Sequence, residues 1–311
     1  MKPQDSKSSA QSSSSVQGAD IENESLESLL ARLEQLNTEK EKNIPFDHEK
    51  LQDIITGLEK DIADGSWIKK DYAHIDLKLM PALIEQANLK YPRLDLKFAT
   101  SSEELCLSIK EAIDNGVQSC RHIVNMKEKG MHFAVIDHRT IENKTSLIFF
   151  ESATLKSMNP AMLALRTQMS IKSQLPDCRF SIVEMDIQRS SSECGIFSLA
   201  LAKKLHTEAG KLTRMHKDNI DGVLCQSDAP LPSDKLDAYL PVSFFKHTQS
   251  RRRLEQYVKS HPGAENEKVN KKDKTLAERF DKNLVTTEEE KTVSVSAHRK
   301  RVKEYKSLLS M

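Results

Sequence analysis

The period of the hydrophobic pattern changes near residue 116, and this change limits the fold more than any other feature of the chain. Before it, leucines and isoleucines recur every three or four residues, which is typical of amphipathic helices. After it, short runs of β-branched and aromatic residues predict strands. These runs lie at 122–125, 132–138, 145–150 and 180–187. The pattern favours an α+β fold in which helices pack on a mixed sheet.

The predicted helices have recognisable start and stop signals. Leucine- and isoleucine-rich patterns begin at Leu26 and Leu51, and a capping box over 101–104 predicts a helix that ends at Gly116. Further helices are predicted over 160–172 and after Cys194. We therefore expect four regions. They are a disordered segment at 1–25, an N-terminal helical region at 26–115, a catalytic core at 116–225 and a C-terminal region at 226–311.

Composition excludes several classes of protein. Residues 1–25 contain eight serines and no Leu, Phe, Tyr or Trp, so they cannot bury enough apolar surface to offset the cost of ordering. A flexible, Ser-rich start is typical of type III secretion signals, and a plain unstructured tail is the alternative. No apolar run approaches the ~20 residues of a transmembrane helix. Five cysteines without a CxxC pair argue against a disulfide framework and a zinc site, so no metal is expected.

Charge is unevenly distributed along the chain. The 47 basic and 46 acidic residues give a net charge of +1, but residues 246–311 alone carry 17 basic and 10 acidic side chains, net +7. The remaining residues therefore carry a net charge of −6. The basic clusters lack the interleaved aromatic residues of nucleic-acid binders, so no nucleic-acid partner is expected.

Cys194 lies at a predicted junction between a strand and a helix. The strand ends near Gln188 and the helix begins at about Gly195, so the thiol would face unpaired N–H groups and the positive end of the helix dipole. Both favour the thiolate, the form that acts as a nucleophile. The polar run at 189–193 argues against ordinary core burial of Cys194, whereas Cys106 and Cys178 fit inert positions.

His132 and Glu151 are the candidate base and its carboxylate partner. They lie at equal distances from the polar turn at 139–144, so an antiparallel hairpin would place them opposite each other, about 5 Å apart at Cβ. A carboxylate beside an imidazole stabilises the imidazolium. Alone, the pair also fits a surface ion pair, but with Cys194 it predicts a Cys-His-Glu triad. The side-chain NH2 of Gln188 could stabilise a developing oxyanion.

These residues lie in segments that resemble a known family. The segments at 132–137 and 145–151, and above all Val183–Ser198, closely resemble the YopJ family of bacterial type III effectors. Shorter matches extend the resemblance to nearly everything after about residue 45. They include Gly65-Ser-Trp67, Met80-Pro-Ala-Leu, Lys246-His-Thr-Gln, Val269-Asn-Lys-Lys, Arg279-Phe-Asp and the Lys303-Glu-Tyr-Lys-Ser-Leu-Leu end.

The resemblance implies a particular fold and activity. The fold is that of the adenoviral and SUMO-deconjugating cysteine proteases, whose chain order of His, acid, Gln and Cys is reproduced here. The activity is transfer of acetyl from acetyl-CoA, through a cysteine acetyl-enzyme, to Ser or Thr, and sometimes Lys, of host signalling kinases such as MAP kinase kinases, which blocks their phosphorylation. The alternative is a cysteine protease that removes ubiquitin or SUMO-like modifiers, because the same triad attacks amides and thioesters.

The resemblance also implies regulation, delivery and ligand sites. Inositol hexakisphosphate (IP6) is expected to activate the enzyme, and the type III secretion machinery to deliver it into the host cytoplasm. By analogy, the CoA phosphates are assigned to Arg189, Ser190, Lys203 and Lys204, with a solvated helix face as the alternative. IP6 is assigned to Lys246, His247, Lys271, Lys272, Arg279, Arg299 and Arg301, because its six phosphates need cations from separate segments. The alternative is that these lysines are simply solvated and bind no ligand. With IP6 bound there, residues 226–311 are expected to form a basic regulatory region.

Overall fold

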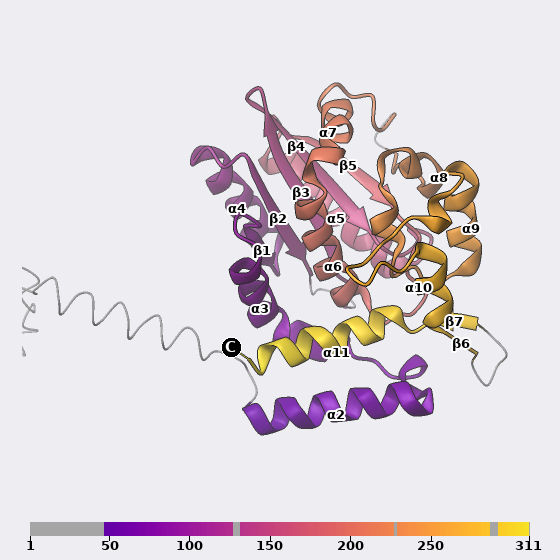
Figure 1. Ribbon diagram of the computed structural model, residues 1–311. Coiled ribbons are helices and arrows are strands. Elements are labelled where there is room, and N and C mark those ends of the chain that lie inside the picture. Colours follow the sequence, from indigo (N-terminus) through magenta and orange to yellow (C-terminus); the bar gives the residue numbers. More distant parts are fainter. Residues whose placement is uncertain (1–46, 127–130, 227–228, 287–291, 311) are drawn as a thin grey trace, which may run out of the picture. The chain divides into compact units, whose positions relative to one another are not determined.

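A five-stranded mixed sheet forms the centre of the described part of the chain (Figure 1). The computed structural model describes residues 47–126, 131–226, 229–286 and 292–310. The strands are β1 (Leu96–Ala99), β2 (Ser119–Val124), β3 (Ala134–Ile141), β4 (Lys144–Glu151) and β5 (Arg179–Glu184), and they lie in chain order. The β1/β2 and β4/β5 pairs are parallel, whereas the two central pairs are antiparallel. The predicted α+β class with a mixed sheet is therefore confirmed.

Helices cover both faces of this sheet. One face packs against α6 (Cys194–Thr207) and α7 (Thr213–Ile220), with α3 (Ala73–Lys90) against α6. The other face packs against α4 (Ser102–Asp114) and α5 (Met158–Gln174). Because strand side chains alternate, neighbouring residues belong to different cores. Val135 and Ile148 lie in the α6 core, and Ile136 and Phe149 in the α4/α5 core.

The β3–β4 hairpin has a tighter turn than predicted. Glu142 and Asn143 both have positive φ, 50° and 63°, which is the geometry of a two-residue type I′ turn. Val135 pairs with Phe150 in this register, so Glu151 is level with position 134 and His132 precedes β3. The expectation that His132 lies directly opposite Glu151 is therefore wrong by two residues. Since side chains repeat every two residues, the shift leaves both on the same face, diagonally placed.

Helical segments from both ends of the chain pack on this core. At the N-terminal side, α2 (His48–Asp64) ends at Gly65, whose φ of 77° suits the predicted stop. The C-terminal side contributes α8 (Ser233–Leu236), α9 (Arg251–Ser260), α10 (Leu276–Lys282), the hairpin of β6 (Leu284–Thr286) and β7 (Thr292–Ser294), and α11 (Ser296–Leu308). Helix α11 contacts α2, α3 and α6, and runs beside α2 in Figure 1. One hydrophobic core joins all these segments.

Two sequence predictions concern residues outside the described ranges, namely the disordered segment at 1–25 and the leucine-patterned helix that begins at Leu26. Among the described residues, no helix is both long enough and apolar enough to cross a membrane.

Candidate active site

His132, just before β3, and Glu151, the last residue of β4, form a buried hydrogen-bonded pair. Nε2 of His132 lies 2.8 Å from Oε2 of Glu151, and both side chains are buried. The second carboxylate oxygen of Glu151 accepts a hydrogen bond from the backbone N–H of Ala153 at 2.8 Å. The carboxylate is therefore fixed in orientation, and the imidazole is fixed by it.

The electrostatic surroundings favour the charged form of His132. Burial works to lower its pKa, but the charge of Glu151 and hydrogen bonds to Cys194 and Glu151 outweigh burial and raise the pKa to about 10. Because Glu151 occupies Nε2, the ring nitrogen that remains for Cys194 is Nδ1. The imidazole thus lies between a carboxylate and a thiol, which is the order of groups found in sites with a cysteine nucleophile.

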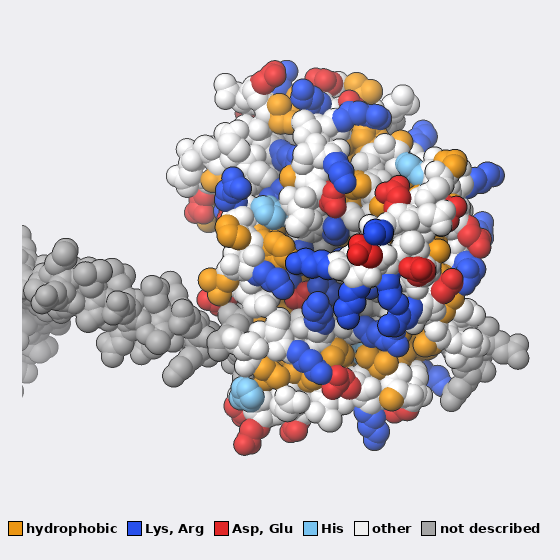
Figure 2. Space-filling view, in the orientation of Figure 1, with side chains coloured by type: hydrophobic (Ala, Val, Ile, Leu, Met, Phe, Trp, Pro, Cys, Tyr) orange, Lys and Arg blue, Asp and Glu red, His pale blue; other side chains and the backbone are white. Residues whose placement is uncertain are grey.

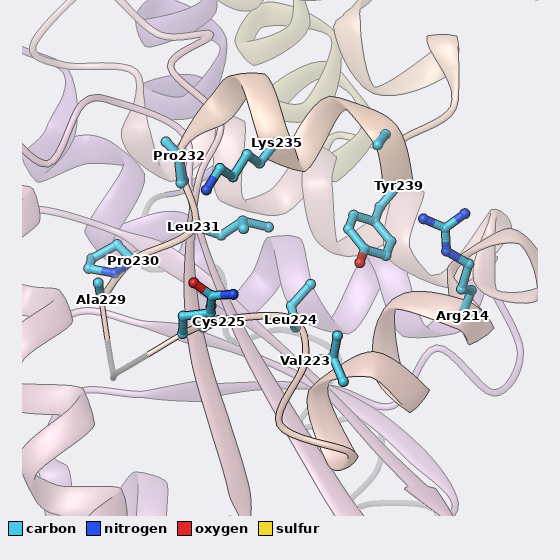
Figure 3. A pocket seen from close by; sticks show the side chains of 12 residues that line it. Arg214, Val223, Leu224, Cys225, Ala229, Pro230, Leu231, Pro232, Lys235 and Tyr239 are labelled. Atoms are coloured by element: carbon cyan, nitrogen blue, oxygen red, sulfur yellow. The ribbon is translucent and has the colours of Figure 1, made fainter.

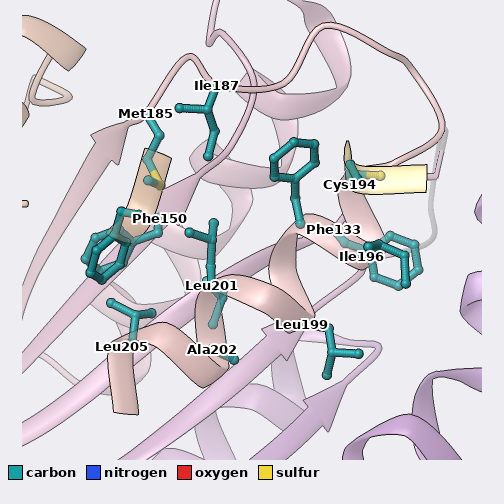
Figure 4. Close-up of a cluster of buried hydrophobic side chains, with 14 of the residues drawn as sticks. Phe133, Phe150, Met185, Ile187, Cys194, Ile196, Leu199, Leu201, Ala202 and Leu205 are labelled. Carbon is teal, nitrogen blue, oxygen red and sulfur yellow. The ribbon is translucent and has the colours of Figure 1, made fainter. Parts of the chain in front are cut away.

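Cys194 is the first residue of α6 and is fully buried (Figure 4). Its side chain lies in the hydrophobic core with Phe133 and Ile187. The expectation that the polar run at 189–193 would keep Cys194 out of the core is therefore wrong. That run is accommodated because its polar groups bond to one another and to side chains from the C-terminal region. Contact with His132 distinguishes Cys194 from an ordinary core cysteine.

Gln188 has a fixed side-chain amide. Its Oε1 accepts a hydrogen bond from Oγ of Ser152 at 2.7 Å, and its Nε2 donates to the backbone oxygen of Ser190 at 2.6 Å. An amide nitrogen has two hydrogens, so one N–H is left to donate elsewhere. Sequence reasoning missed Ser152, whose only signal was its position directly after Glu151.

The four residues assigned to CoA do not gather at one place. Arg189 is exposed and pairs with Asp186 at 2.7 Å. The hydroxyl of Ser190 donates to Glu193 at 2.5 Å. Lys203 is buried in an ion pair with Glu304 at 2.8 Å, and burial lowers its pKa. We therefore remove Lys203 from the candidate ligand contacts.

Cations from α6, α10, α11 and the segment around Lys246 form a basic cluster (Figure 2). It consists of Lys204, Lys246, Arg279, Lys300 and Lys303. Burial and the other charges of the cluster lower the pKa of Lys246 to about 7. Lys300 and Lys303 were missed from the sequence, although their spacing places them on one side of a helix. Lys204, assigned to CoA, belongs here instead.

The other residues assigned to IP6 are placed differently. Lys271 and Lys272 are exposed, and the charges that lower the pKa of Lys246 most come from other residues. Arg299 is exposed and donates to Oδ1 of Asn283 at 2.8 Å. His247 is buried, with Nδ1 2.8 Å from Oγ of Ser296 and no hydrogen-bond partner at Nε2.

Arg301 requires a correction. Its guanidinium is fully buried and donates to both carboxylate oxygens of Asp76, at 2.9 and 3.0 Å, and to the backbone oxygen of Ser192 at 2.6 Å. A guanidinium with these partners has no access to a ligand in the basic cluster. We therefore remove Arg301 from the candidate IP6 contacts.

A pocket of about 650 Å³ lies away from these residues, beside β5 (Figure 3). Its lining includes Arg214, Cys225, Lys235 and Tyr239, and none of the predicted site residues. The Cys225 thiol is directed at the backbone oxygen of Ile182, 3.8 Å away. The pocket therefore has no part in the chemistry of Cys194.

Comparisons with known proteins agree on one family. The model of the YopJ serine/threonine acetyltransferase family matches residues 51–307. The serine/threonine-protein acetyltransferase YopJ of Yersinia pestis is 54% identical over 275 residues, which cover 88% of this chain and 95% of that protein. HopZ1a of Pseudomonas syringae pv. syringae, also a serine/threonine-protein acetyltransferase, is 24% identical over 70% of this chain and 66% of its own length.

Solved structures give the same result. A structure of AvrA delL154 with IP6 and CoA has a TM-score of 0.81 and 54% identity, and the match covers 85% of this chain and 99% of that chain. A structure of HopZ1a with IP6 and CoA has a TM-score of 0.66 and 18% identity, over 84% of this chain and 98% of that chain, and it supports the fold alone.

Proposed function

Since the chain belongs to the YopJ family of serine/threonine acetyltransferases, we propose that it transfers acetyl from acetyl-CoA to protein Ser or Thr, and in some acceptors Lys, through Cys194. The observation that carries this proposal is the contact series from Glu151 through His132 to Cys194 at the start of α6. It supplies a carboxylate, an imidazolium and a thiol in the order that covalent acyl transfer requires. The relatives favour this reaction over hydrolysis of ubiquitin or SUMO-like modifiers.

In the first half of the reaction, the Cys194 thiolate attacks the thioester carbonyl carbon. The remaining N–H of Gln188 and the backbone N–H of Cys194 stabilise the oxyanion that forms. When the carbon–sulfur bond to CoA breaks, the CoA sulfur takes the proton of the His132 imidazolium. The products are an acetyl-enzyme and neutral His132. One thioester replaces another, so the step is nearly balanced in free energy.

In the second half, His132 acts as the base. The acceptor hydroxyl loses its proton to His132 while its oxygen attacks the acetyl carbon on Cys194. Breaking the bond to Sγ releases the thiolate and restores the imidazolium. Glu151 stabilises the charge on His132 at both stages because it remains hydrogen-bonded to Nε2.

The basic cluster is the proposed site for IP6, with Arg299 at its edge. Its members come from four separate segments, so a compact polyanion can contact all of them at once. Burial and, after it, the surrounding positive charges lower the pKa of Lys246, and bound phosphates would offset the part that comes from the charges. AvrA has been solved with IP6 and CoA, which supports use of both ligands here. Arg189, exposed beside Gln188, is the proposed contact for a CoA phosphate.

The biological setting is proposed from the family. Substrates would be host signalling kinases such as MAP kinase kinases, and acetylation would block the hydroxyls that are normally phosphorylated. Delivery would use the type III machinery, with action in the host cytoplasm. Residues 226–311 would form the regulatory region, because they contribute most of the basic cluster.

Radiolabelled acetyl-CoA tests the proposed reaction. The full chain is incubated with label and IP6, and label is followed first to Cys194 by peptide mass spectrometry and then to a MAP kinase kinase. Cys194→Ala should abolish both signals, whereas Cys178→Ala, at a half-buried cysteine in the other core, should keep them. Transfer to the kinase by Cys194→Ala would overturn the covalent route, and cleavage of ubiquitin or SUMO conjugates without labelling would favour the protease.

A further inference from the structure

The loop between Gln188 and Cys194 is held by side chains from the C-terminal region. Gln249 is buried, and its Oε1 accepts hydrogen bonds from the backbone N–H groups of Arg189, at 2.6 Å, and Ser190, at 3.0 Å. Its Nε2 donates to Oγ of Ser190 at 3.1 Å and to the carboxylate of Glu193. One amide thus contacts both the beginning and the end of the loop.

Arg301 also contacts this loop. It donates to the backbone oxygen of Ser192, two residues before Cys194, and forms a two-pronged ion pair with Asp76. The Asp76 carboxylate also accepts a 2.5 Å hydrogen bond from the hydroxyl of Tyr305. A Cβ atom on Gly195 would lie 2.9 Å from Oδ2 of Asp76, so this ion pair is packed directly against the first turn of α6.

Glu193 lies close to both Gln249 and Arg301. Its Oε2 accepts from Ser190 and Gln249, and its Oε1 lies 3.8 Å from Nη1 of Arg301 without a hydrogen bond. Burial raises the pKa of Glu193, although the charge of Arg301 opposes this. The loop therefore contains a buried carboxylate that accepts a hydrogen bond from within the loop, from Ser190, and one from the C-terminal side, from Gln249.

Gln249 and Arg301 are both close in sequence to members of the basic cluster. Gln249 follows Lys246 by three residues, and Arg301 lies between Lys300 and Lys303 on α11. Arg279 ties the two segments together, since it donates to the backbone oxygen of Lys246 at 3.2 Å and to Oγ of Ser296 at 3.3 Å. A polyanion that draws these cations together therefore also fixes the backbone that bears Gln249 and Arg301.

We propose that Gln249 and Arg301 are positioning residues that hold the 188–193 loop in its reactive shape, and that they couple the basic cluster to Cys194. Neither touches a reacting atom. They act by setting where the Gln188 amide and the N–H of Cys194 lie relative to the acetyl carbonyl. This inference rests on the proposed acetyl transfer and adds the means by which IP6 activates it.

The test separates binding of IP6 from its effect on the reaction. Gln249→Ala is made in the full chain, with Gln256→Ala on the exposed side of α9 as the matched control. Calorimetry gives the Kd for IP6, and rapid quenching gives the rate of acetyl-enzyme formation at saturating IP6 and acetyl-CoA. We expect Gln249→Ala to lower this rate about 100-fold, as a misplacement near 1 Å would. The Kd should stay within about twofold, and Gln256→Ala should match the unmodified chain.

A second variant distinguishes a specific defect in the loop from a general loss of folding. Gln249→Glu keeps the side-chain shape and can still accept from Arg189 and Ser190, but its carboxylate repels Glu193 and cannot donate to it. Its defect should therefore shrink as pH is lowered, whereas the defect of Gln249→Ala should not. Arg301→Lys, compared with the exposed Arg252→Lys, should lower the rate without changing the Kd.

Each contrary result has a separate meaning. If the Gln249 and Arg301 variants form acetyl-enzyme at the normal rate, the inference is wrong and the proposed function stands. If the Kd for IP6 weakens in step with the rate, these residues belong to the ligand site and positioning is overturned. If the unmodified chain forms no acetyl-enzyme with IP6, the proposed function itself fails.

Discussion

At the scale of single residues, the charge on His132 decides when the thiol can act. Glu151 and Cys194 raise the pKa of His132 to about 10 against the effect of burial. The His132 imidazole is therefore protonated at neutral pH and loses its proton as pH rises through about 10. Since the first half-reaction needs imidazolium to protonate the leaving CoA sulfur, its rate should fall on that alkaline side.

Glu151→Gln tests this assignment. The substitution removes the charge that raises the pKa of His132, so the alkaline fall in acetyl-enzyme formation should move at least one pH unit lower. The rate at pH 7.5 should also fall, by about 10²- to 10⁴-fold. The measurement is a pH profile of single-turnover acetylation between pH 6 and 10.5. An unchanged alkaline limb would show that Glu151 does not act on His132.

Gly195 is a second residue whose role is local. Asp76 is fixed by Arg301 and Tyr305, and a new Cβ at position 195 would lie 2.9 Å from its Oδ2. Gly195→Ala should therefore cost about 1–3 kcal/mol of unfolding free energy through overpacking. Gly210→Ala is the control, because a Cβ added there would meet no atom within 4 Å, and it should change stability by less than about 0.5 kcal/mol. Urea denaturation measures both, and equal values would contradict the packing argument.

At the scale of elements, the sequence predicted most of the architecture but not every detail. The capping box at 101–104 gave α4 its correct start, since Ser101 accepts from the N–H of Glu104 at 3.1 Å. Strand β1 was missed because four residues contain no readable alternation, and its formation depends on pairing with β2. The predicted register of the β3–β4 hairpin was wrong by two residues, because it was inferred from the position of a polar turn. The residues in positive φ, Glu142 and Asn143, set the true register.

Helix α5 shows why an apolar pattern does not identify the buried face. Met162, Leu163, Leu165 and Met169 suggested the helix. Of these only Leu163 is buried, and the buried side is completed by Ala164, Thr167 and Ile171. Both faces are apolar, so periodicity alone predicted the helix but not its orientation. Packing against β4 and β5 selects the face with the smaller and branched side chains.

This difference gives a stability prediction. Ile171→Ala should destabilise the protein by about 2–5 kcal/mol, because it opens a cavity beneath α5. Met169→Ala, on the same helix, should change the free energy of unfolding by less than about 0.5 kcal/mol. Chemical denaturation of both variants provides the comparison. A large loss for Met169→Ala would show that its outward side chain is covered in the folded protein.

At the scale of the whole molecule, the near-zero net charge conceals a concentrated positive site. The excess of basic residues in 246–311 indicated that the C-terminal part meets a polyanion. It did not indicate which side chains gather, because Lys204 comes from α6 and joins Lys246, Arg279, Lys300 and Lys303 only after folding. The same limit applies to Arg301, which pairs with Asp76 while its neighbours in sequence join the cluster. Sequence charge located the region, whereas tertiary packing separated the cations of the basic cluster from Arg301, whose guanidinium is held in a buried ion pair.

The packing of these cations predicts that IP6 binding is linked to proton uptake. Lys246 has an ordinary pKa of 10.5 that falls to about 7 in the free protein, so above pH 7 its amine is largely neutral. Bound phosphates favour the charged form and raise that pKa, so at pH 8 binding should take up about one proton at this position. Affinity should therefore strengthen as pH falls from 9 to 7 and level off below 7.

Calorimetry in buffers of different ionisation enthalpy measures this uptake. Lys246→Met removes the titrating amine, so its proton uptake at pH 8 should be lower by about one than that of the unmodified chain. The phosphates of IP6 also titrate, but they contribute to both proteins and cancel in the difference. Lys259→Met, on the exposed side of α9, should leave the uptake unchanged. If Lys246→Met and the unmodified chain take up equal numbers of protons, Lys246 does not meet the phosphates, and IP6 must bind outside the cluster.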